Sequence, residues 1–198
     1  RRSADIELEM HAHDDLGLAT ANTLAAIVAG ATHVNTTVHG LGERAGNAPL
    51  EEVVMALKHL HGIDTGIELA DFERLSTLVA SASGRPITWQ KSLVGQGAFT
   101  HEAGIHVDGL MKDRLNYQGV DPNELGRDHT LVLGKHSGTH AVQCSYANLG
   151  FCLDRSQAEC ILAQIRSYVT RFKRPPGNSE LLDFYHSLSG SGEKVVCL

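Results

Sequence analysis

Apolar and polar side chains alternate near the start of the chain, over residues 6–13. Apolar residues occupy positions 6, 8 and 10, whereas the other face carries Glu7, Glu9, His11 and His13. Successive side chains of a strand point to opposite sides, so this period of two predicts a strand with one apolar and one polar face. Two acids and two histidines on one face make a poor core and a plausible site.

A helix and a second strand are predicted next. Asp14 or Asp15 is expected to cap the helix, which should run to about Ala29 and end at Gly30. The alternation returns over Val34–Val38, which predicts the second strand. A strand, a helix of about fourteen residues and another strand form a βαβ unit, so the two strands should be parallel.

A loop with three glycines, residues 40–47, follows the second strand. Its last residue, Asn47, is expected to cap a helix that has Pro49 near its start and Gly62 at its end. Asp71 is expected to cap a further helix. The side chains expected to be buried in these two helices are Val53, Val54, Leu57 and Leu60, and Leu75, Leu78, Val79 and Ala82.

Beyond Ser83–Pro86 the alternation of strands and helices stops, so this segment is the candidate domain boundary. Ser156 and Glu159 have the spacing of a capping box. The other elements expected are a helix from about Ala103 to Lys112, a brief strand over Thr130–Leu133 and a helix over Thr139–Leu149. Two C-terminal helices should bury Ala158, Ile161, Leu162, Ile165 and Phe172, and Leu181, Leu182, Tyr185 and Leu188.

Composition and charge exclude some classes of protein. The 198 residues have room for one domain with a small appendage. A net charge of −6 gives no basic footprint for nucleic acid, and no apolar run approaches the roughly 18 residues that would indicate a membrane span. The four cysteines lack C-x-x-C spacing and no signal peptide precedes them, so we expect reduced thiols in a cytoplasmic protein. The chain opens without Met and soon enters a strand, which favours a fragment or a split subunit.

His11 and His13 are the candidate metal ligands. Residues two apart on a strand point the same way, with Cα atoms roughly 6.6 Å apart, so two imidazoles can converge on one ion. Histidine suits zinc, manganese or iron, whereas carboxylate and water suit magnesium or manganese. Two histidines make only part of a site, so at least one carboxylate must complete it. The alternative is two hydrogen-bonded histidines at the end of a strand.

Four motifs, in order along the chain, resemble the isopropylmalate/homocitrate synthase family of the DRE-TIM metallolyase superfamily. The resemblance extends to about Leu188. The motifs are Leu8-x-x-His11-x-His13-Asp14-Asp15-x-Gly17-x-Ala19, Gly40-Leu41-Gly42-Glu43-Arg44-Ala45-Gly46-Asn47 followed by Leu50-Glu51, Phe99-Thr100-His101-Glu102-Ala103-Gly104-Ile105-His106, and Leu131-Val132-Leu133-Gly134-Lys135-His136-Ser137-Gly138.

The resemblance implies an α/β fold that contains the last strands and helices of a TIM (β/α)8 barrel, followed by small, mostly helical C-terminal subdomains. It implies that residues 1–84 form the C-terminal part of the barrel domain. Residues 85–150 would form a linker and post-barrel subdomain, and residues 151–198 a helical C-terminal subdomain.

The resemblance also implies a reaction. A divalent metal (Mg, Mn or Zn) binds a 2-oxo acid, which condenses with acetyl-CoA in a Claisen-type step before the thioester is hydrolysed. His11 and His13 match the family's two histidine ligands, and Asn47 matches an asparagine beside the metal. His106 and Tyr117 match a catalytic pair that reaches into the partner subunit's barrel. By position alone, His106 would be a surface histidine and Tyr117 a packing residue.

Glu43 and Arg44 have two open interpretations, contact with substrate or a brace of the loop as an ion pair. The family's aspartate ligand and catalytic glutamate lie on upstream segments that this chain does not contain. The resemblance therefore implies that the chain needs the upstream barrel half, and we expect that alone it neither folds stably nor catalyses. A homodimer that exchanges C-terminal segments is also implied.

The substrate follows only from the finer resemblance. The short C-terminal end and Phe172-Lys173-Arg174-Pro175 are most similar to the homocitrate synthases associated with nitrogenase, which implies nitrogen fixation and 2-oxoglutarate as the oxo acid. Lysine-pathway homocitrate synthase, isopropylmalate synthase and citramalate synthase are the alternatives. A different class of function is a non-catalytic fragment that dimerises or binds a barrel half without turnover.

Overall fold

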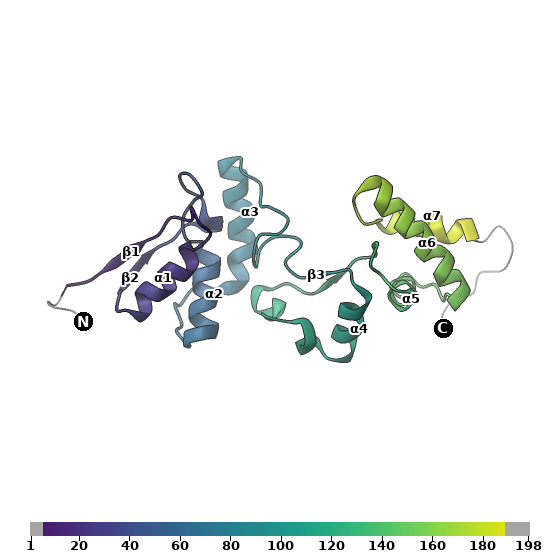
Figure 1. Cartoon of the computed structure of the whole chain (residues 1–198), viewed down its shortest axis with the longest axis horizontal. Coiled ribbons are helices and arrows are strands. Elements are labelled where there is room, and N and C mark those ends of the chain that lie inside the picture. The colour runs from purple at the N-terminus through teal and green to yellow at the C-terminus, as the bar shows by residue number, and fades with distance from the viewer. Residues whose placement is uncertain (1–5, 189–198) are drawn as a thin grey trace. The chain divides into compact units, whose positions relative to one another are not determined.

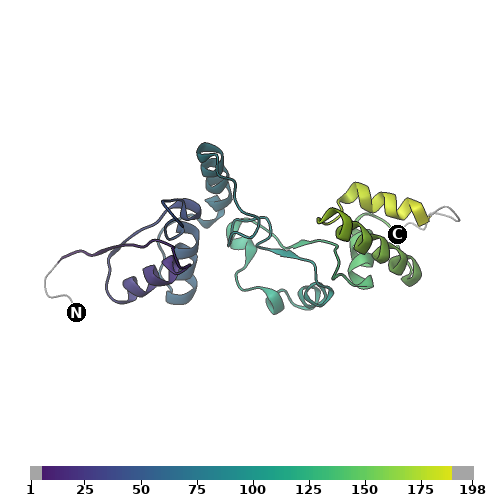
Figure 2. The same cartoon turned by 45° about the horizontal axis from the view of Figure 1, so that its top comes forward.

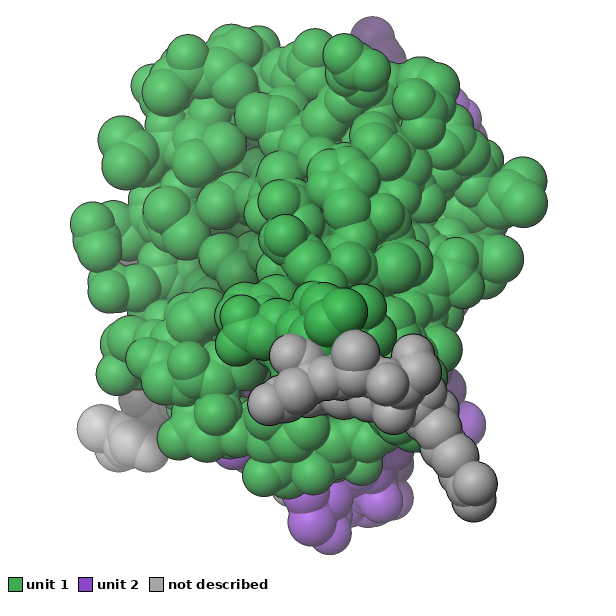
Figure 3. Space-filling model, turned by 90° about the vertical axis from the view of Figure 1, so that its left-hand side faces the viewer, with its two compact units in different colours: residues 1–99, 122–128 green, residues 100–121, 129–198 purple. Residues whose placement is uncertain are grey.

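The computed structural model describes residues 6–188, without the side chains of Val107 and Met111 (Figure 1). The chain divides into two compact units, which are coloured separately in Figure 3 and described separately below. Unit 1 contains residues 1–99 and 122–128, and unit 2 contains residues 100–121 and 129–198. The domain limits expected at 84/85 and 150/151 stay a prediction, because compactness alone does not define evolutionary domains.

Unit 1 contains the predicted βαβ arrangement. Its strands and helices are β1 (Glu9–His11), α1 (Ala19–Val28), β2 (His33–Asn35), the 3-10 turn Val38–Gly40, α2 (Leu50–His61), the 3-10 turn Leu69–Asp71, α3 (Phe72–Ser83) and the 3-10 turn Pro122–Leu125. β1 and β2 pair in parallel, with Met10 opposite Val34. This pairing confirms the predicted strand direction. The sheet has two strands, so the described residues form no closed barrel.

The two strands are shorter than predicted. Ile6 and Leu8 lie before β1 and are 60% and 51% exposed, because no element of the described chain covers them. The chain leaves the strand conformation after Asn35 and enters the turn at Val38–Gly40. A small core forms where α1 packs against α2, and it includes Ala19, Val53 and Leu57.

The helix α1 begins later than expected. Gly17 has φ +70°, and its N–H donates to the Asp14 carbonyl at 2.9 Å, so a turn precedes the helix. Ala19 is the first helical residue, and its N–H donates to Asp14 Oδ1 at 2.8 Å. Asp14 thus accepts a hydrogen bond from the first residue of α1, although Leu18 and not Asp14 occupies the N-cap position.

Three other predictions for unit 1 are wrong in detail. Asn47 does not cap α2, because its side chain bonds to the preceding loop and Pro49 holds the N-cap position. Leu60 is 70% exposed because it lies in the last turn of α2, beyond the contact with α1. The helix α3 buries Phe72 and Ser76 rather than the expected face. Leu78 and Ala82 of that expected face are exposed.

Unit 2 is mainly helical. Its elements are β3 (Thr100–His101), α4 (Gly104–Lys112), the 3-10 turn Arg114–Tyr117, β4 (Thr130–Leu131), α5 (Thr139–Asn148), α6 (Arg155–Phe172) and α7 (Asn178–Leu188). β3 and β4 pair in parallel. Figures 1 and 2 both show α5, α6 and α7 grouped together. Their shared core includes Tyr146, whose hydroxyl donates to the Leu181 carbonyl at 2.6 Å.

The capping box of α6 uses other residues than predicted. Asp154 accepts from the Gln157 N–H at 2.8 Å, and Gln157 Oε1 accepts from the Asp154 N–H at 2.9 Å. Glu159 instead pairs with Arg155 one turn away, at 3.0 Å. The predicted buried positions of α6 are confirmed except for Phe172, which is 50% exposed at the end of the helix.

The described cysteines include both free thiols and a disulfide-bonded residue. Cys144 and Cys160 carry free thiols, as predicted, whereas Cys152 is disulfide-bonded, which corrects the prediction for that residue. Sequence spacing does not reveal which cysteines meet in space. Cys197 lies outside the described residues.

Between residues 6 and 188, no helix is both long and apolar enough to cross a bilayer.

Candidate metal and active site

The two histidines at the end of β1 converge. His11 Nε2 and His13 Nε2 lie 3.0 Å apart, with ring centroids separated by 4.9 Å. An ion bound at about 2.1 Å holds two adjacent octahedral ligand atoms about 3.0 Å apart and two tetrahedral ones about 3.4 Å apart. The observed separation therefore fits two ligands of one ion, and it also fits an N–H···N hydrogen bond between the rings.

Asn47 lies beside this pair because the backbone joins the two segments. His13 and Asn47 form an isolated antiparallel bridge, and the Ala48 N–H donates to the Ala12 carbonyl at 3.2 Å. The Asn47 amide N–H₂ donates to the Leu41 carbonyl at 3.1 Å, which orients the side chain. Asn47 Oδ1 and His13 Nδ1 are both buried without a hydrogen-bond partner among the described residues. A buried, unpaired carbonyl oxygen is the donor type that a hard divalent cation accepts.

The three glycines of the loop make room for Asn47. A Cβ on Gly42 would lie 2.5 Å from Asn47 Nδ2, and one on Gly40 would lie 2.7 Å from the Asn47 carbonyl oxygen. Gly46 has φ +94°, and a Cβ there would lie 2.1 Å from the Gly40 carbonyl oxygen. These distances are below ordinary contact, so larger residues would displace the loop from Asn47.

Arg44 braces the loop through a partner that the sequence did not indicate. Its guanidinium makes two hydrogen bonds to the Asp15 carboxylate, at 2.8 and 3.0 Å. The Arg44 hydrogen bond holds the pKa of Asp15 below its usual range. Arg44 has φ +53°, an uncommon backbone conformation for a residue other than glycine. The ion pair therefore joins Asp15 to Arg44, and Glu43 next to it is exposed.

Glu51 and His39 form a buried connection that sequence reasoning missed. Glu51 is completely buried, and both its carboxylate oxygens accept from the His39 N–H at 3.1 Å. His39 has φ +59°, and its Nε2 lies 3.9 Å from Glu51 Oε1. Burial lowers the pKa of His39, against an opposing effect of Glu51. The available signal was an acid three residues before Val54, on the apolar side of the predicted helix.

The predicted catalytic pair meets in unit 2. His106 lies in α4 and Tyr117 at the end of the following 3-10 turn, and their rings stack with centroids 4.2 Å apart and planes 27° apart. The ring of Tyr117 packs over Gly109, where a Cβ would lie 2.4 Å from it. Tyr117 is 38% exposed. Stacking through the ring faces leaves the polar edges of both side chains available to a ligand.

A second histidine chain lies beside this pair and was not predicted. His129 Nε2 lies 3.1 Å from Gln118 Oε1, so the imidazole N–H donates to the amide oxygen. His129 Nδ1 then accepts from His101 Nε2, also at 3.1 Å. The rings of His101 and His106 meet edge-on, with centroids 6.3 Å apart. Burial, and then the charges of His129 and His106, lower the pKa of His101.

The histidine pair lacks an acidic partner in the described chain. Across residues 6–188, no group of three or more His, Cys, Asp or Glu side chains is arranged to hold a metal ion. His11 and His13 belong to unit 1, and His106 and Tyr117 belong to unit 2. Each pair is thus locally formed, and neither contains all the groups that a metal-dependent reaction requires.

Comparison with known proteins finds two family matches along the chain. Residues 2–79 match the HMGL-like family, and residues 93–173 match the homocitrate synthase post-HMGL domain-like family. The first match ends before the predicted boundary at Ser83–Pro86, and the second begins after it.

Three relatives illustrate the range of activities among similar proteins. The chain is 47% identical over 191 residues to 2-isopropylmalate synthase 2 of Caldanaerobacter subterraneus subsp. tengcongensis, covering 96% of this chain and 50% of the relative. It is 46% identical over 178 residues to homocitrate synthase 1 of Nostoc sp., covering 90% and 47%. It is 45% identical over 174 residues to a putative (R)-citramalate synthase CimA of Methanopyrus kandleri, covering 88% and 34%. The chain therefore spans about half, or less, of the curated relatives it matches.

Proposed function

The chain belongs to the isopropylmalate/homocitrate synthase family, and from that premise we propose that it forms part of a metal-dependent synthase that condenses acetyl-CoA with a 2-oxo acid. We further propose homocitrate synthase, with 2-oxoglutarate as the oxo acid and nitrogen fixation as the context. Isopropylmalate and citramalate synthesis are the alternatives, since relatives of all three kinds are 45–47% identical to the chain.

The convergence of His11 and His13 beside Asn47 is the observation that carries this proposal. Their two Nε2 atoms are 3.0 Å apart, and Asn47 Oδ1 is buried and unpaired among the described residues. His11 and His13 would hold the divalent metal, with Asn47 beside it. When bound, such an ion polarises the ketone of the oxo acid and stabilises the alkoxide that forms. The remaining carboxylate ligand is expected from the upstream barrel half.

His106 and Tyr117 are proposed to act on the acetyl-CoA side of the reaction. The free edge of the His106 imidazole would take a proton from the thioester methyl group, because a neutral imidazole nitrogen can accept a proton. The Tyr117 hydroxyl would donate a hydrogen bond to the oxygen on which negative charge develops. Stacking at 4.2 Å fixes both rings relative to each other. In the homodimer that we propose, the pair would serve the partner subunit's barrel.

Glu43 and Arg44 have different roles in this proposal. Arg44 braces the loop, because its guanidinium is already engaged by Asp15 at 2.8 Å. Glu43 is exposed and is the better candidate for contact with substrate. The same two hydrogen bonds that engage Arg44 would keep the backbone near Asn47 in place.

The test is turnover by the chain together with its upstream barrel half. Release of coenzyme A is measured with 2-oxoglutarate, with pyruvate and with the branched oxo acid that leads to isopropylmalate. We expect the highest kcat/KM with 2-oxoglutarate, loss of turnover in His11→Ala, and normal turnover in His61→Ala, which changes an exposed histidine at the end of α2. Preference for another oxo acid would select the corresponding alternative synthase.

A non-catalytic partner is the second candidate function. The observation in its favour is the missing acidic ligand among the described residues. If the reconstituted protein binds metal and yet no oxo acid supports release of coenzyme A, this second function replaces the first. Size-exclusion chromatography with light scattering of the same sample tests the proposed homodimer.

A further inference from the structure

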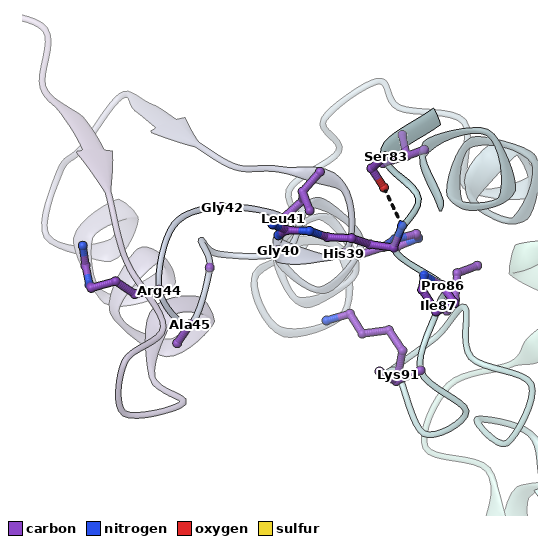
Figure 4. A pocket seen from close by; sticks show the side chains of 14 residues that line it. His39, Gly40, Leu41, Gly42, Arg44, Ala45, Ser83, Pro86, Ile87 and Lys91 are labelled. Carbon is purple, nitrogen blue, oxygen red and sulfur yellow. Dashed lines mark hydrogen bonds between the residues drawn. The ribbon is translucent and has the colours of Figure 1, made fainter. Parts of the chain in front are cut away.

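A cavity of about 200 Å³ lies in unit 1 against the glycine-rich loop. Its walls are residues 39–42 and 44–46, the end of α3 at Val79 and Ser83, and residues 85–88 and 91 (Figure 4). All of these residues belong to the same compact unit. None of the functions proposed above uses this cavity.

Cationic side chains line the cavity, and no acidic residue does. Arg44 is engaged by Asp15, and Lys91 Nζ donates to Glu52 Oε1 at 2.6 Å. An ammonium group has three donors, so Lys91 retains two. Figure 4 shows the Lys91 side chain extending toward the glycine-rich loop.

Arg85 contributes the charge that is not balanced. Its backbone N–H donates to Ser83 Oγ at 3.3 Å, the dashed line of Figure 4. Its guanidinium makes neither an ion pair nor a hydrogen bond with any described residue. A guanidinium presents five N–H donors in a plane, a shape that matches two oxygens of a phosphate or carboxylate.

The loop adds backbone donors to the same cavity. The Gly46 N–H closes a turn onto the Glu43 carbonyl at 2.9 Å. Within that turn and just before it, the N–H groups of Gly42, Arg44 and Ala45 donate to no acceptor in residues 6–188. Successive N–H groups around a left-handed residue form a concave anion-binding nest, and Arg44 is left-handed here.

We propose that this cavity binds a phosphate group, with Arg85 as the principal cation and Lys91 and the loop amides as further donors. A carboxylate has only two oxygens, whereas a phosphate can use donors from the loop and from the segment 85–91 together. Three carboxylates near the lining are already bonded, Asp15 to Arg44, Glu52 to Lys91 and Glu51 to the His39 N–H. Glu43, between two lining residues of the loop, is exposed and does not line the cavity.

The size of the cavity limits what the site can hold. Drug-sized ligands occupy cavities of about 300–1,000 Å³. The observed volume of about 200 Å³ suits a single phosphate group rather than a whole nucleotide. The group could belong to free phosphate or to a phosphate of coenzyme A whose remainder lies outside. The proposal does not depend on turnover, so it stands or fails separately from the proposed function.

The experiment reads the site directly through the loop amides. The 198-residue chain is labelled with nitrogen-15, combined with the unlabelled upstream barrel half, and titrated with inorganic phosphate, coenzyme A or dephospho-coenzyme A. We expect saturable downfield shifts of the Gly42, Arg44 and Ala45 amide protons. Arg85→Gln should weaken the apparent affinity about tenfold, because it removes a charge-assisted, two-point contact.

Arg74→Gln is the matched control, because Arg74 lies on α3 outside the cavity and pairs with Asp71. It should bind like the wild type. Arg85→Lys should give an intermediate affinity, and a dispersed amide spectrum shows that each variant is folded.

Shifts with coenzyme A that are stronger than with inorganic phosphate identify coenzyme A as the source of the phosphate group, and weaker binding of dephospho-coenzyme A assigns the 3′-phosphate. Shifts with inorganic phosphate alone identify a free-phosphate site. Absence of loop shifts with all three ligands, or equal binding by the Gln variants at positions 85 and 74, would overturn the proposal.

Discussion

At the scale of single residues, Asn47 shows how one side chain acquires its role from its surroundings. Its sequence position suggested a helix cap, yet its amide donates to the Leu41 carbonyl at 3.1 Å. That bond leaves Oδ1 buried and unpaired among the described residues, beside the backbone of His13. The side chain lies against the loop rather than at the helix start because the three glycines of the loop permit this close approach.

His13→Ala should weaken divalent metal binding by at least about tenfold, because it removes one of two converging ligands. Isothermal titration with Mn²⁺ or Zn²⁺, on the chain combined with its barrel half, measures the affinity. His61→Ala changes an exposed histidine and should leave the affinity unchanged. Equal affinities of the wild type and His13→Ala would show that the 3.0 Å contact with His11 is only a hydrogen bond.

Glu51→Ala should destabilise unit 1 by about 1–3 kcal/mol, because it leaves the buried His39 N–H without an acceptor. Urea unfolding of the chain combined with its upstream barrel half, followed by circular dichroism, measures the change. Glu73→Ala, at an exposed position in the first turn of α3, should stay within about 0.5 kcal/mol of the wild type. A similar loss in both variants would argue against the specific role of the buried carboxylate.

Unit 2 should lose stability as the pH falls from 7.5 to 5.5. Burial and the neighbouring His129 and His106 lower the pKa of His101 in the folded state, so the unfolded chain binds the proton first. Stability is therefore present above the ordinary histidine pKa and declines below it. His101→Gln should flatten this dependence, whereas His136→Gln, at an exposed position, should not. Thermal midpoints at the two pH values, measured on the chain combined with its upstream barrel half, provide the test. An unchanged dependence of the midpoint on pH in His101→Gln would contradict the assignment.

At the scale of elements, local signals identified most helices but set their ends less reliably. The helix α4 starts and ends as predicted, whereas α1 starts at Ala19 after an unpredicted turn. The start of α6 depends on Asp154 and Gln157, two residues earlier than the pair expected from sequence. Both patterns satisfy the same spacing rule, so only the backbone conformation at Asp154 (φ −71°, ψ 173°) distinguishes them.

Asp154→Ala should lower the thermal midpoint of unit 2 by about 4 °C, because the Gln157 N–H at the start of α6 loses its acceptor. Glu159→Ala removes only an exposed pair with Arg155 and should change the midpoint by less than about 2 °C. Differential scanning calorimetry on the chain combined with its upstream barrel half compares the two variants. A larger effect of Glu159→Ala would restore the capping box first expected from the sequence.

At the scale of the whole molecule, the sheet of unit 1 has two strands, β1 and β2, and both of its edges are unpaired within the described chain. Open parallel edges expose N–H and C=O groups to pairing with other chains. Ile6 and Leu8 beside β1 are also exposed. We interpret this surface as the position at which the upstream barrel half would continue the sheet.

The chain alone should therefore aggregate or unfold and release no coenzyme A, whereas co-expression with the upstream barrel half should restore a monodisperse, active protein. Static light scattering and the coenzyme A assay test both parts. His11→Ala in the restored protein should remain folded and lose turnover. Full activity of the chain alone would refute the need for a partner half.

The sequence by itself determined the parallel βαβ unit, the helices α4 and α5, and the close approach of His11 and His13. Periodicity and motif spacing are local properties, so they can be recognised without knowledge of distant contacts. His106 and Tyr117 could be paired only through the family resemblance, and the structure shows their rings stacked at 4.2 Å.

Only the tertiary structure decided which side chains complete each other across long stretches of chain. Arg44 meets Asp15 across 29 residues, and His101 meets His129 across 28. The burial of Glu51, the free oxygen of Asn47 and the cavity beside Arg85 arise in the same way. Each depends on where two segments approach in space and on which polar groups become buried there. No local pattern encodes either property.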